Sequence, residues 1–534
     1  RMSRQGMVRC RDDVHLETTN EQLPCRCGTQ WEGLFRGPGH PESTLYMRQT
    51  GARDALDGSH RWHAFCIPLQ KMMKVSGMLG LGIALILGSG SVATAGVYHL
   101  RRTVVVGDSL LAGFGSGGLV ARGATGQRFS APAQLARQAH VTMPQPLMSG
   151  PGVPPPLQVE DSNLNGVLDP GEVRRSSDAV GFRRSPGQGV RNLAIPGEDL
   201  SSVFETLDAE DVGRRLVRSN IKGRDVLKFL ILGLPLRGSA VSQLTRVHSL
   251  HPTFAMVWLG NNDVLPMATH TDPTAVTMSV TAFGTAYRRF LNRLADARID
   301  MAVANLPDVT QIAALRGPGA GVTDCRKGDG TIEPVAPDAL LSIALDPATL
   351  PTPSCGRVLD SVEQATIRAT VMAFNAEIAA AIAEVELDRG VRIAPVDMFA
   401  LFDQVARQGY DVRGDGTTVL RSTYLGGLFS LAGVHPTRTG QGLLANAFID
   451  AIHARFGDAI PRVDVAAVAI GDPWVQSTFR PAAEPPFGLI KDTDVDIGAA
   501  LDHALGNLSD HTRDILKSLK HRVRDVFRHI EDIF

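Results

Sequence analysis

Short apolar runs alternate along the middle of the chain with longer segments in which apolar residues recur every three or four positions. The short runs predict buried strands at Val104–Val106, Thr253–Leu259, Met301–Ala304 and Val391–Val396, the last weakened by Pro395. The longer segments predict helices at Val280–Ala297, Ser361–Glu386 and Gly440–Phe456. Strands that alternate with helices are typical of a parallel α/β sheet covered by helices on both faces.

This alternation occupies residues 96–465 and is interrupted by two insertions. Residues 123–186 are rich in Pro, Gly and Arg, and residues 316–353 contain a Gly/Pro/Asp-rich loop between two cysteines. A linker is expected over residues 466–498, followed by a C-terminal amphipathic helix over residues 499–534. This basic helix is expected to pack on the domain or on a second copy of the chain. Adsorption to an anionic membrane surface is the alternative.

The N-terminal part has the layout of a secretory signal. Lys71 and Lys74 precede an apolar run at Val75–Leu87, and Ala93-Thr94-Ala95 forms a small-residue cleavage site. We therefore expect a signal peptide over residues 72–95 and an exported protein that is periplasmic, on the cell surface or secreted. Residues 1–71 show no steady apolar period and are expected to be a non-functional upstream segment. The alternative is a cytoplasmic segment with an uncleaved membrane anchor.

Composition limits the classes of partner. The chain has 534 residues, 54 basic and 55 acidic side chains, and 5% aromatic residues. This balance offers neither the basic surface nor the stacking platform of a nucleic-acid-binding protein. After the signal-like segment only Cys325 and Cys355 remain, and in an exported protein such a pair predicts a disulfide. Two unpaired thiols are the alternative.

Candidate chemistry follows two of the predicted strands. The sequence "GDSL" (107–110) comes after the first strand, and "GNND" (260–263) comes after the second. Ligands of parallel sheets gather at the carboxyl ends of the strands. His435 stands later, shortly before the helix predicted from Gly440. Ser109, His435 and the Asn262 amide are the nucleophile, base and oxyanion donor that an ester hydrolase needs, although each alone also suits a cap or turn.

Together these segments resemble the GDSL, or SGNH, hydrolases. Four blocks appear in the order of that family: "GDSL" at 107–110, "NLAIPGEDL" at 192–200, "GNND" at 260–263 and "GVHPT" at 433–437. The segment "VANLPDVTQI" at 303–312 is also similar to members of the family. The resemblance extends from Arg102 to Phe456 outside the insertions. It implies a three-layer, flavodoxin-like α/β/α sandwich that hydrolyses esters of lipids, sugars or small acyl groups.

The resemblance also implies a role for each site residue. Ser109 attacks the ester carbonyl, and His435 takes its proton and returns it to the leaving alcohol. The oxyanion is held by the backbone N–H groups of Ser109 and Gly197 and by the side-chain amide of Asn262. No cofactor is implied for catalysis.

One position departs from the family's pattern. The aspartate that the family usually places three residues before the histidine is Ala432 here. A backbone carbonyl could hold the Nδ1–H of His435 instead, or Asp411 or Asp415 could supply a carboxylate. The alternative hypothesis is a catalytically impaired, secreted binding protein on the same scaffold.

The first insertion contains "DSNLNGVLDPGE" at 161–172, which has the spacing of an EF-hand calcium loop. The ligand positions fall on Asp161, Asn163, Asn165, the carbonyl of Val167, Asp169 and Glu172. Three prolines at 154–156 exclude an ordinary incoming helix. The motif therefore predicts a lone structural Ca²⁺ loop rather than a paired sensor, and a Gly/Asn turn without a metal is the alternative.

Overall fold

The computed structural model describes residues 98–475, except 124–125, 178, 219, 236–238, 344–348 and 350–351. It also describes four short strands: β1 (Val14–Thr18), β2 (Glu21–Cys25), β17 (Arg480–Pro481) and β18 (Ile490–Lys491). The antiparallel pair β1 and β2 belongs to a unit spanning Arg1–Ser91, and a second unit spans Val92–Phe534. The expected signal peptide at 72–95 and C-terminal helix at 499–534 lie outside the described residues, as does most of the expected linker.

A parallel sheet of four strands forms the centre of the second unit. Its order is β14 (Ile393–Val396), β8 (Asp300–Ala304), β7 (Phe254–Trp258) and β3 (Thr103–Gly107). Residues 191–195 run along the free side of β3, where the amide of Val105 donates to the carbonyl of Arg191 at 2.8 Å. The sheet thus has the 2-1-3-4-5 order of flavodoxin-like folds. The predicted parallel sheet is confirmed.

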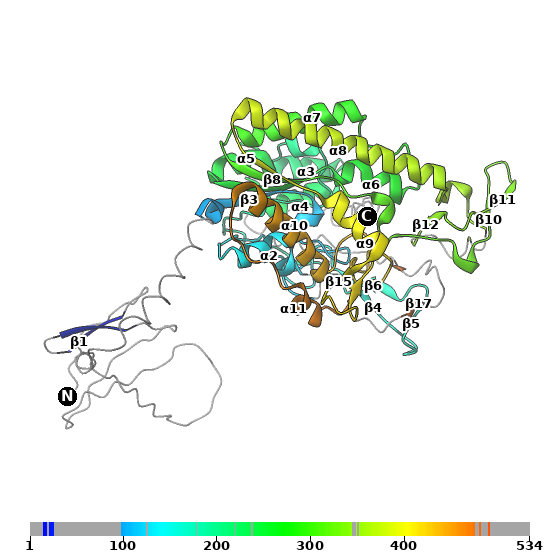
Figure 1. Ribbon diagram of the computed structural model, residues 1–534, viewed down its shortest axis with the longest axis horizontal. Helices are drawn as coiled ribbons and strands as arrows, with labels where there is room; N and C mark the ends of the chain where they lie inside the picture. The colour runs from blue at the N-terminus through cyan, green and yellow to red at the C-terminus, as the bar shows by residue number, and fades with distance from the viewer. Residues whose placement is uncertain are drawn as a thin grey trace, which may run out of the picture. The chain divides into compact units, whose positions relative to one another are not determined.

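Helices cover both faces of this sheet (Figure 1). On one side lie α5 (Gln243–Leu250), α7 (Val280–Ala295) and α8 (Ser361–Arg389), and on the other lie α2 (Ala131–Gln138) and α10 (Arg438–Phe456). The three predicted helices are therefore present, with ends shifted by a few residues. Their arrangement completes the expected three-layer α/β/α sandwich.

Local signals in the sequence explain where two of these helices begin and end. The carboxylate of Asp360 accepts hydrogen bonds from the amides of Val362 and Glu363, and the Glu363 carboxylate accepts one from the amide of Asp360. This reciprocal arrangement is a capping box, and it fixes the start of α8. Gly457 ends α10 with a φ of 78°, a left-handed conformation that favours glycine.

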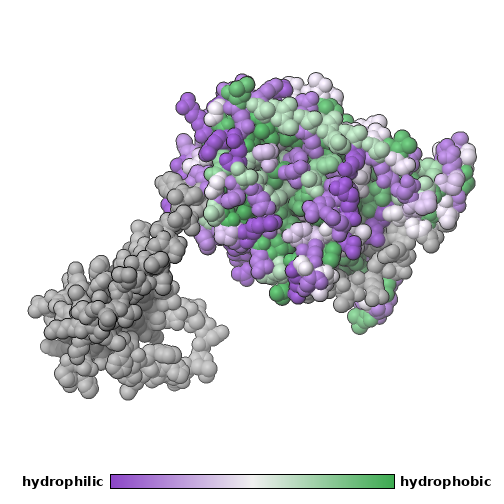
Figure 2. Space-filling model, in the orientation of Figure 1, coloured by the Kyte–Doolittle hydropathy of each residue, from purple (hydrophilic) through white to green (hydrophobic). Residues whose placement is uncertain are grey.

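Helix α8 is long and apolar enough, by length and composition, to cross a membrane, and among the described helices it alone meets that test. Core helices of globular proteins meet the same test. Ile367, Val371 and Phe374 form a buried face of α8, and the Phe374 ring lies 4.3 Å from that of Phe283 in α7. Met372 on the same helix is 54% exposed. Figure 2 shows hydrophobic and hydrophilic residues interspersed on the visible face of the described part.

Both insertions contain short strands. The first contains β4 (Leu157–Val159), β5 (Val167–Leu168) and β6 (Val173–Arg175). There β5 pairs with β17, and β6 pairs with β4 and β18. The second contains β10 (Asp324–Arg326), β11 (Ile332–Pro334) and β12 (Leu340–Ser342), and it is bordered by β9 (Leu315–Arg316) and β13 (Val358–Leu359), which both pair with β12. A disulfide joins Cys325 to Cys355 in the structure. It borders a small separate core that includes Val322 and Leu341.

The remaining elements connect these parts. They are α1 (Ser109–Ala112), α3 (Ala209–Val217), α4 (Gly223–Leu232), α6 (Asn261–Thr269), α9 (Met398–Gln408), α11 (Val465–Ile470), β15 (Tyr410–Asp411) and β16 (Val419–Leu420). Helices α1 and α6 matter most for function, because they begin directly after the carboxyl ends of β3 and β7.

Candidate active site

Ser109 is the first residue of α1, two residues after β3 ends. Asp108 caps this short helix, and its carboxylate accepts a hydrogen bond from the amide of Leu110 at 3.0 Å. A Cβ atom at Gly107 would overlap the carbonyl oxygen of Trp258, so the tight approach of β3 to β7 requires a glycine here. Ser109 itself is 4% exposed. The turn therefore places the serine at the carboxyl edge of the sheet.

The segment that contains Asn262 lies beside this turn. Gly107 pairs with Trp258 at the ends of the two parallel strands, so the loops that follow both strands are neighbours. Gly260 has a φ of 113°, and α6 begins at the next residue. The side-chain amide of Asn261 donates to the carboxylate of Asp108 at 2.8 Å. This bond ties the asparagine segment directly to the serine turn.

The segment around Gly197 joins the same cluster. The amide of Ile195 donates to the carbonyl of Gly107 at 3.0 Å. The side-chain amide of Asn262 donates to the carbonyl of Glu198 at 2.8 Å. Gly197 has a φ of 76°, a left-handed turn conformation. An asparagine amide has two N–H donors, so this bond leaves one N–H of Asn262 for a ligand.

His435 lies at the same edge, against the chain that follows Ser109. Its ring centroid is 4.9 Å from that of Phe114, and its side chain is fully buried. The Ser430 hydroxyl donates to the backbone carbonyl of His435 at 2.8 Å and accepts from the amide of Ser116 at 2.7 Å. These contacts hold the histidine loop against the segment that begins with the serine turn.

Burial sets the protonation of the acids and of the histidine. Desolvation lowers the pKa of His435 to about 3, so the imidazole is neutral at pH 7, as a general base must be. Desolvation also raises the pKa of Asp108 to about 7, although the hydrogen bonds from Asn261 and Leu110 oppose this shift. The pKa of Asp263 rises to about 7 for the same reason. The carboxylate of Asp263 accepts a hydrogen bond from the backbone amide of Leu200 at 3.0 Å. This bond is a second link between the Gly197 and Asn262 segments.

An ion pair that the sequence did not reveal supports the Gly197 segment. The ammonium of Lys228 lies 2.9 Å from the carboxylate of Glu198, and both side chains are 0% exposed. Lys228 also donates to the carbonyls of Ser202 and Glu205, at 3.0 and 3.3 Å. Burial raises the pKa of Glu198, while the charge of Lys228 opposes the rise. The available signal was a lysine inside the apolar run "VLKFLIL" of α4, where a charge needs a buried partner.

The two carboxylates considered as substitutes for the missing aspartate have local partners. Asp411 accepts from the backbone amides of Arg413, Gly414 and Gly416, at 3.1 Å, 2.9 Å and 2.6 Å. Asp415 accepts from the amide and the hydroxyl of Thr417. Both side chains therefore stabilise their own loop. Ala432 is partly buried beside the main core.

The predicted calcium loop is folded back on its own acids. The Asp161 carboxylate accepts from the amides of Asn165 and Gly166, at 3.2 and 2.8 Å, and Asn163 donates to Asp169 at 2.9 Å. Glu172 accepts from the amides of Ser162 and Asp169, each at 3.0 Å. No group of three or more His, Cys, Asp or Glu side chains in the described residues is arranged to hold a metal. Calcium binding stays a prediction from the sequence.

Comparisons with known proteins find a matching family model and similar solved structures. A family model described as GDSL-like Lipase/Acylhydrolase matches residues 104–448. One similar solved structure is LAE5, an alpha/beta hydrolase enzyme from the metagenome of Lake Arreo, Spain. The two sequences are 13% identical, the match covers 66% of this chain and 94% of that chain, and the TM-score is 0.28. Another is an extracellular lipase from Streptomyces rimosus, at 14% identity, 66% and 98% coverage and a TM-score of 0.27. A comparison with curated proteins finds no match.

Lys228→Met should destabilise the protein by about 3–5 kcal/mol, because it leaves Glu198 as an uncompensated buried charge. The double variant with Glu198→Met should recover most of the loss. Lys327→Met is the matched control, since Lys327 pairs with Glu333 on the surface and should cost at most about 1 kcal/mol. Urea unfolding measures all three. A Lys228→Met variant no weaker than the control would show that the buried pair contributes little.

Calcium at millimolar concentration should raise the melting temperature, because a ligand bound only by the native state stabilises it. Asp161→Ala combined with Glu172→Ala should cancel this rise, and magnesium should not replace calcium. Differential scanning calorimetry with and without a chelator makes the comparison. Equal melting temperatures in calcium and chelator would remove the metal from the loop.

Proposed function

This chain belongs to the GDSL-like lipase and acylhydrolase family, and we propose that it is a serine ester hydrolase acting through an acyl-serine intermediate. The hydrogen-bonded convergence of the Ser109 turn, the Gly197 loop and Asn262 carries the proposal. The substrates we expect are esters of lipids, sugars or small acyl groups. The signal-like segment at residues 72–95 supports export to the periplasm, the cell surface or the medium.

In the proposed first step the Oγ of Ser109 attacks the ester carbonyl while His435 takes the serine proton. The tetrahedral oxyanion is held by the backbone N–H groups of Ser109 and Gly197 and by the second N–H of Asn262. His435 then returns the proton to the alcohol, which leaves as the acyl-serine forms. Water attacks this ester with His435 as base, and the carboxylic acid and free Ser109 are regenerated. Each oxyanion donor is expected to contribute about 10²–10³ in kcat.

The positions of the oxyanion donors depend on buried polar groups around them. Asn262 is fixed by its bond to the Glu198 carbonyl, and the carboxylate of Glu198 is fixed by Lys228. Such preorganised donors lose little energy to reorganisation when the oxyanion forms. This support favours catalysis over the alternative of an impaired binding protein. The alternative rests on Ala432, because a missing carboxylate leaves the imidazolium of the transition state without a countercharge.

Ser109→Ala should abolish hydrolysis of p-nitrophenyl acetate and butyrate and leave the melting temperature nearly unchanged. The reason is that the serine supplies the attacking oxygen but little packing. Ser116→Ala is the matched control, since its buried hydroxyl has no hydrogen-bond partner among the described residues and should be dispensable. Undiminished turnover in Ser109→Ala would exclude this residue as the nucleophile.

The acid limb of kcat/KM should lie well below pH 6. The base must be neutral, and burial lowers the pKa of His435, so protonation stops the reaction only at a lower pH than for an exposed histidine, whose pKa is about 6.5. A kcat/KM profile between pH 4 and 9 on folded protein, with folding followed by circular dichroism, measures this limb. A fall centred between pH 6 and 7 would contradict the closed environment of His435.

Ala432→Asp should raise kcat about tenfold, which corresponds to about 1.4 kcal/mol, if a carbonyl alone orients His435. The added carboxylate would stabilise the imidazolium and would shift the acid limb upward. Ala432→Asn is the uncharged control. If Ala432→Asp loses activity while Ala432→Asn does not, another acid already orients His435. Asp411 and Asp415 are then the residues to replace next. If neither the parent protein nor Ala432→Asp hydrolyses esters of any chain length, the impaired binding protein becomes the better account.

A further inference from the structure

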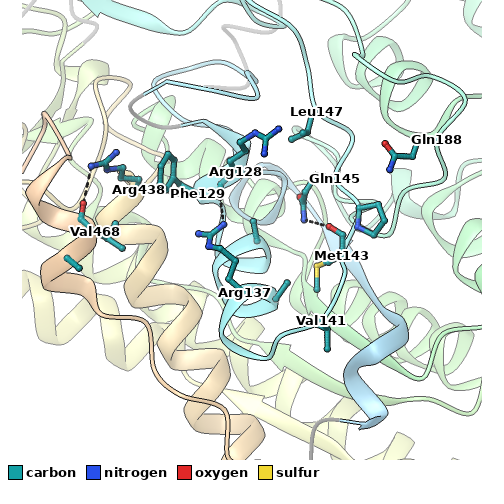
Figure 3. Close-up of a pocket in the computed structure, with 14 residues that line it drawn as sticks. Arg128, Phe129, Arg137, Val141, Met143, Gln145, Leu147, Gln188, Arg438 and Val468 are labelled. Atoms are coloured by element: carbon teal, nitrogen blue, oxygen red, sulfur yellow. Dashed lines mark hydrogen bonds between the residues drawn. The ribbon is translucent and has the colours of Figure 1, made fainter. Parts of the chain in front are cut away.

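A cavity of about 700 Å³ lies between α2, α10, α11 and the loop at 141–147 (Figure 3). Among the described residues that line it, none is Ser109, Gly197, Asn262 or His435. Its volume falls within the range of about 300–1,000 Å³ typical of sites for one small molecule. The cavity is therefore large enough for a ligand and is not the place of the proposed chemistry.

Much of the wall of this cavity is apolar. They include Ala133 and Ala136 of α2, Val141, Met143 and Leu147 of the following loop, and Val468 of α11. Phe129 adds an aromatic ring beside α10, as Figure 3 shows. An alkyl chain in contact with these side chains would leave water, and each buried methylene favours binding.

Three arginines, Arg128, Arg137 and Arg438, bring positive charge to the same cavity. No Asp or Glu is among the described residues that line it, and none of the three arginines forms an ion pair with a described residue. Arg137 donates to the backbone carbonyl of Arg128 at 2.7 Å, and Arg438 donates to that of Val468 at 3.2 Å. Neutral carbonyls do not compensate a guanidinium charge, so an anion that enters the cavity would meet positive charge and no acidic side chain among the described lining residues.

Asp472 is bonded to other groups and does not line the cavity. The charge of Arg438 lowers the pKa of Asp472, but burial has the larger effect and raises it. One oxygen of Asp472 accepts from the amide and the hydroxyl of Thr439, at 2.9 and 2.7 Å. The other accepts from the amide of Trp474 at 3.2 Å. Arg438 instead stacks on Phe129, with its guanidinium carbon 4.9 Å from the ring centroid.

We propose that this cavity binds one medium-chain fatty-acid carboxylate. The alkyl chain lies along the Val141–Leu147 wall and α2, and the carboxylate is held by the guanidinium groups of Arg128 and Arg137. A guanidinium presents a planar fork of donors that matches a carboxylate. The side chain of Arg128 makes no hydrogen bond to any described residue, so its donors are available. The proposal does not rest on the esterase function, because it uses none of the catalytic residues.

Isothermal titration of the full chain with octanoate, decanoate and dodecanoate below their micellar concentrations tests the proposal. The dissociation constant should fall about fourfold per methylene added. Decanol and inorganic phosphate should each bind at least tenfold more weakly than decanoate, because each lacks one half of the recognised chemistry. Dodecyl phosphate should not bind more tightly than dodecanoate.

The double variant Arg128→Gln with Arg137→Gln should weaken decanoate binding at least tenfold and leave decanol binding unchanged. Arg413→Gln, at an exposed arginine outside the cavity, is the matched control and should bind decanoate as the parent does. Equal affinity for decanol and decanoate, or unchanged decanoate binding in the double variant, would overturn the proposal. Tighter binding of phosphate or of dodecyl phosphate would assign the cavity to a different anion. Because the readout is binding, it is independent of whether the chain hydrolyses esters.

Discussion

The close pairing of β3 and β7 at their carboxyl ends sets the geometry on which the candidate site depends. Gly107 lies so near the carbonyl of Trp258 that a side chain cannot be added. The loops that follow the two strands are therefore neighbours, and the bond from Asn261 to Asp108 joins them. Residues 191–195 bond to the other side of β3 and bring Gly197 to the same edge. A nucleophile and three oxyanion donors can then be assembled from segments far apart in the sequence.

Holding this edge together requires polar groups that are expensive to bury. Glu198 and Lys228 are paired with no exposure to solvent, and Asp108 and Asp263 have pKa values raised to about 7 by burial. Each is bonded to a backbone or side-chain partner, which limits the cost of burial. These groups act on the site by fixing its loops, because Glu198 follows Gly197 and Asp263 follows Asn262. The catalytic hypothesis thus depends on a supporting network as much as on Ser109 and His435.

Much of the fold could be predicted because its strands and helices have distinct apolar periods. The four strands, the helices α7, α8 and α10, and the capping box at Asp360 follow from local patterns. The strand-like segment at 191–195 could not be recognised, since it is short and is defined by bonds to β3 rather than by its own pattern. The partner of Lys228 could not be predicted either, because pairing across 30 residues depends on the folded chain. The blocks of the site were identified through a family resemblance, which supplied their order and roles but not their contacts.

The most direct test of the account is covalent labelling of the nucleophile. A fluorophosphonate loses fluoride when an activated serine attacks its phosphorus, and mass spectrometry of the tryptic peptide 103–122 locates the adduct. The account predicts an adduct on Ser109 in the folded protein, a much slower reaction in His435→Ala, and none after unfolding. An adduct on Ser116, no adduct at all, or labelling of Ser109 at an unchanged rate in His435→Ala would contradict it.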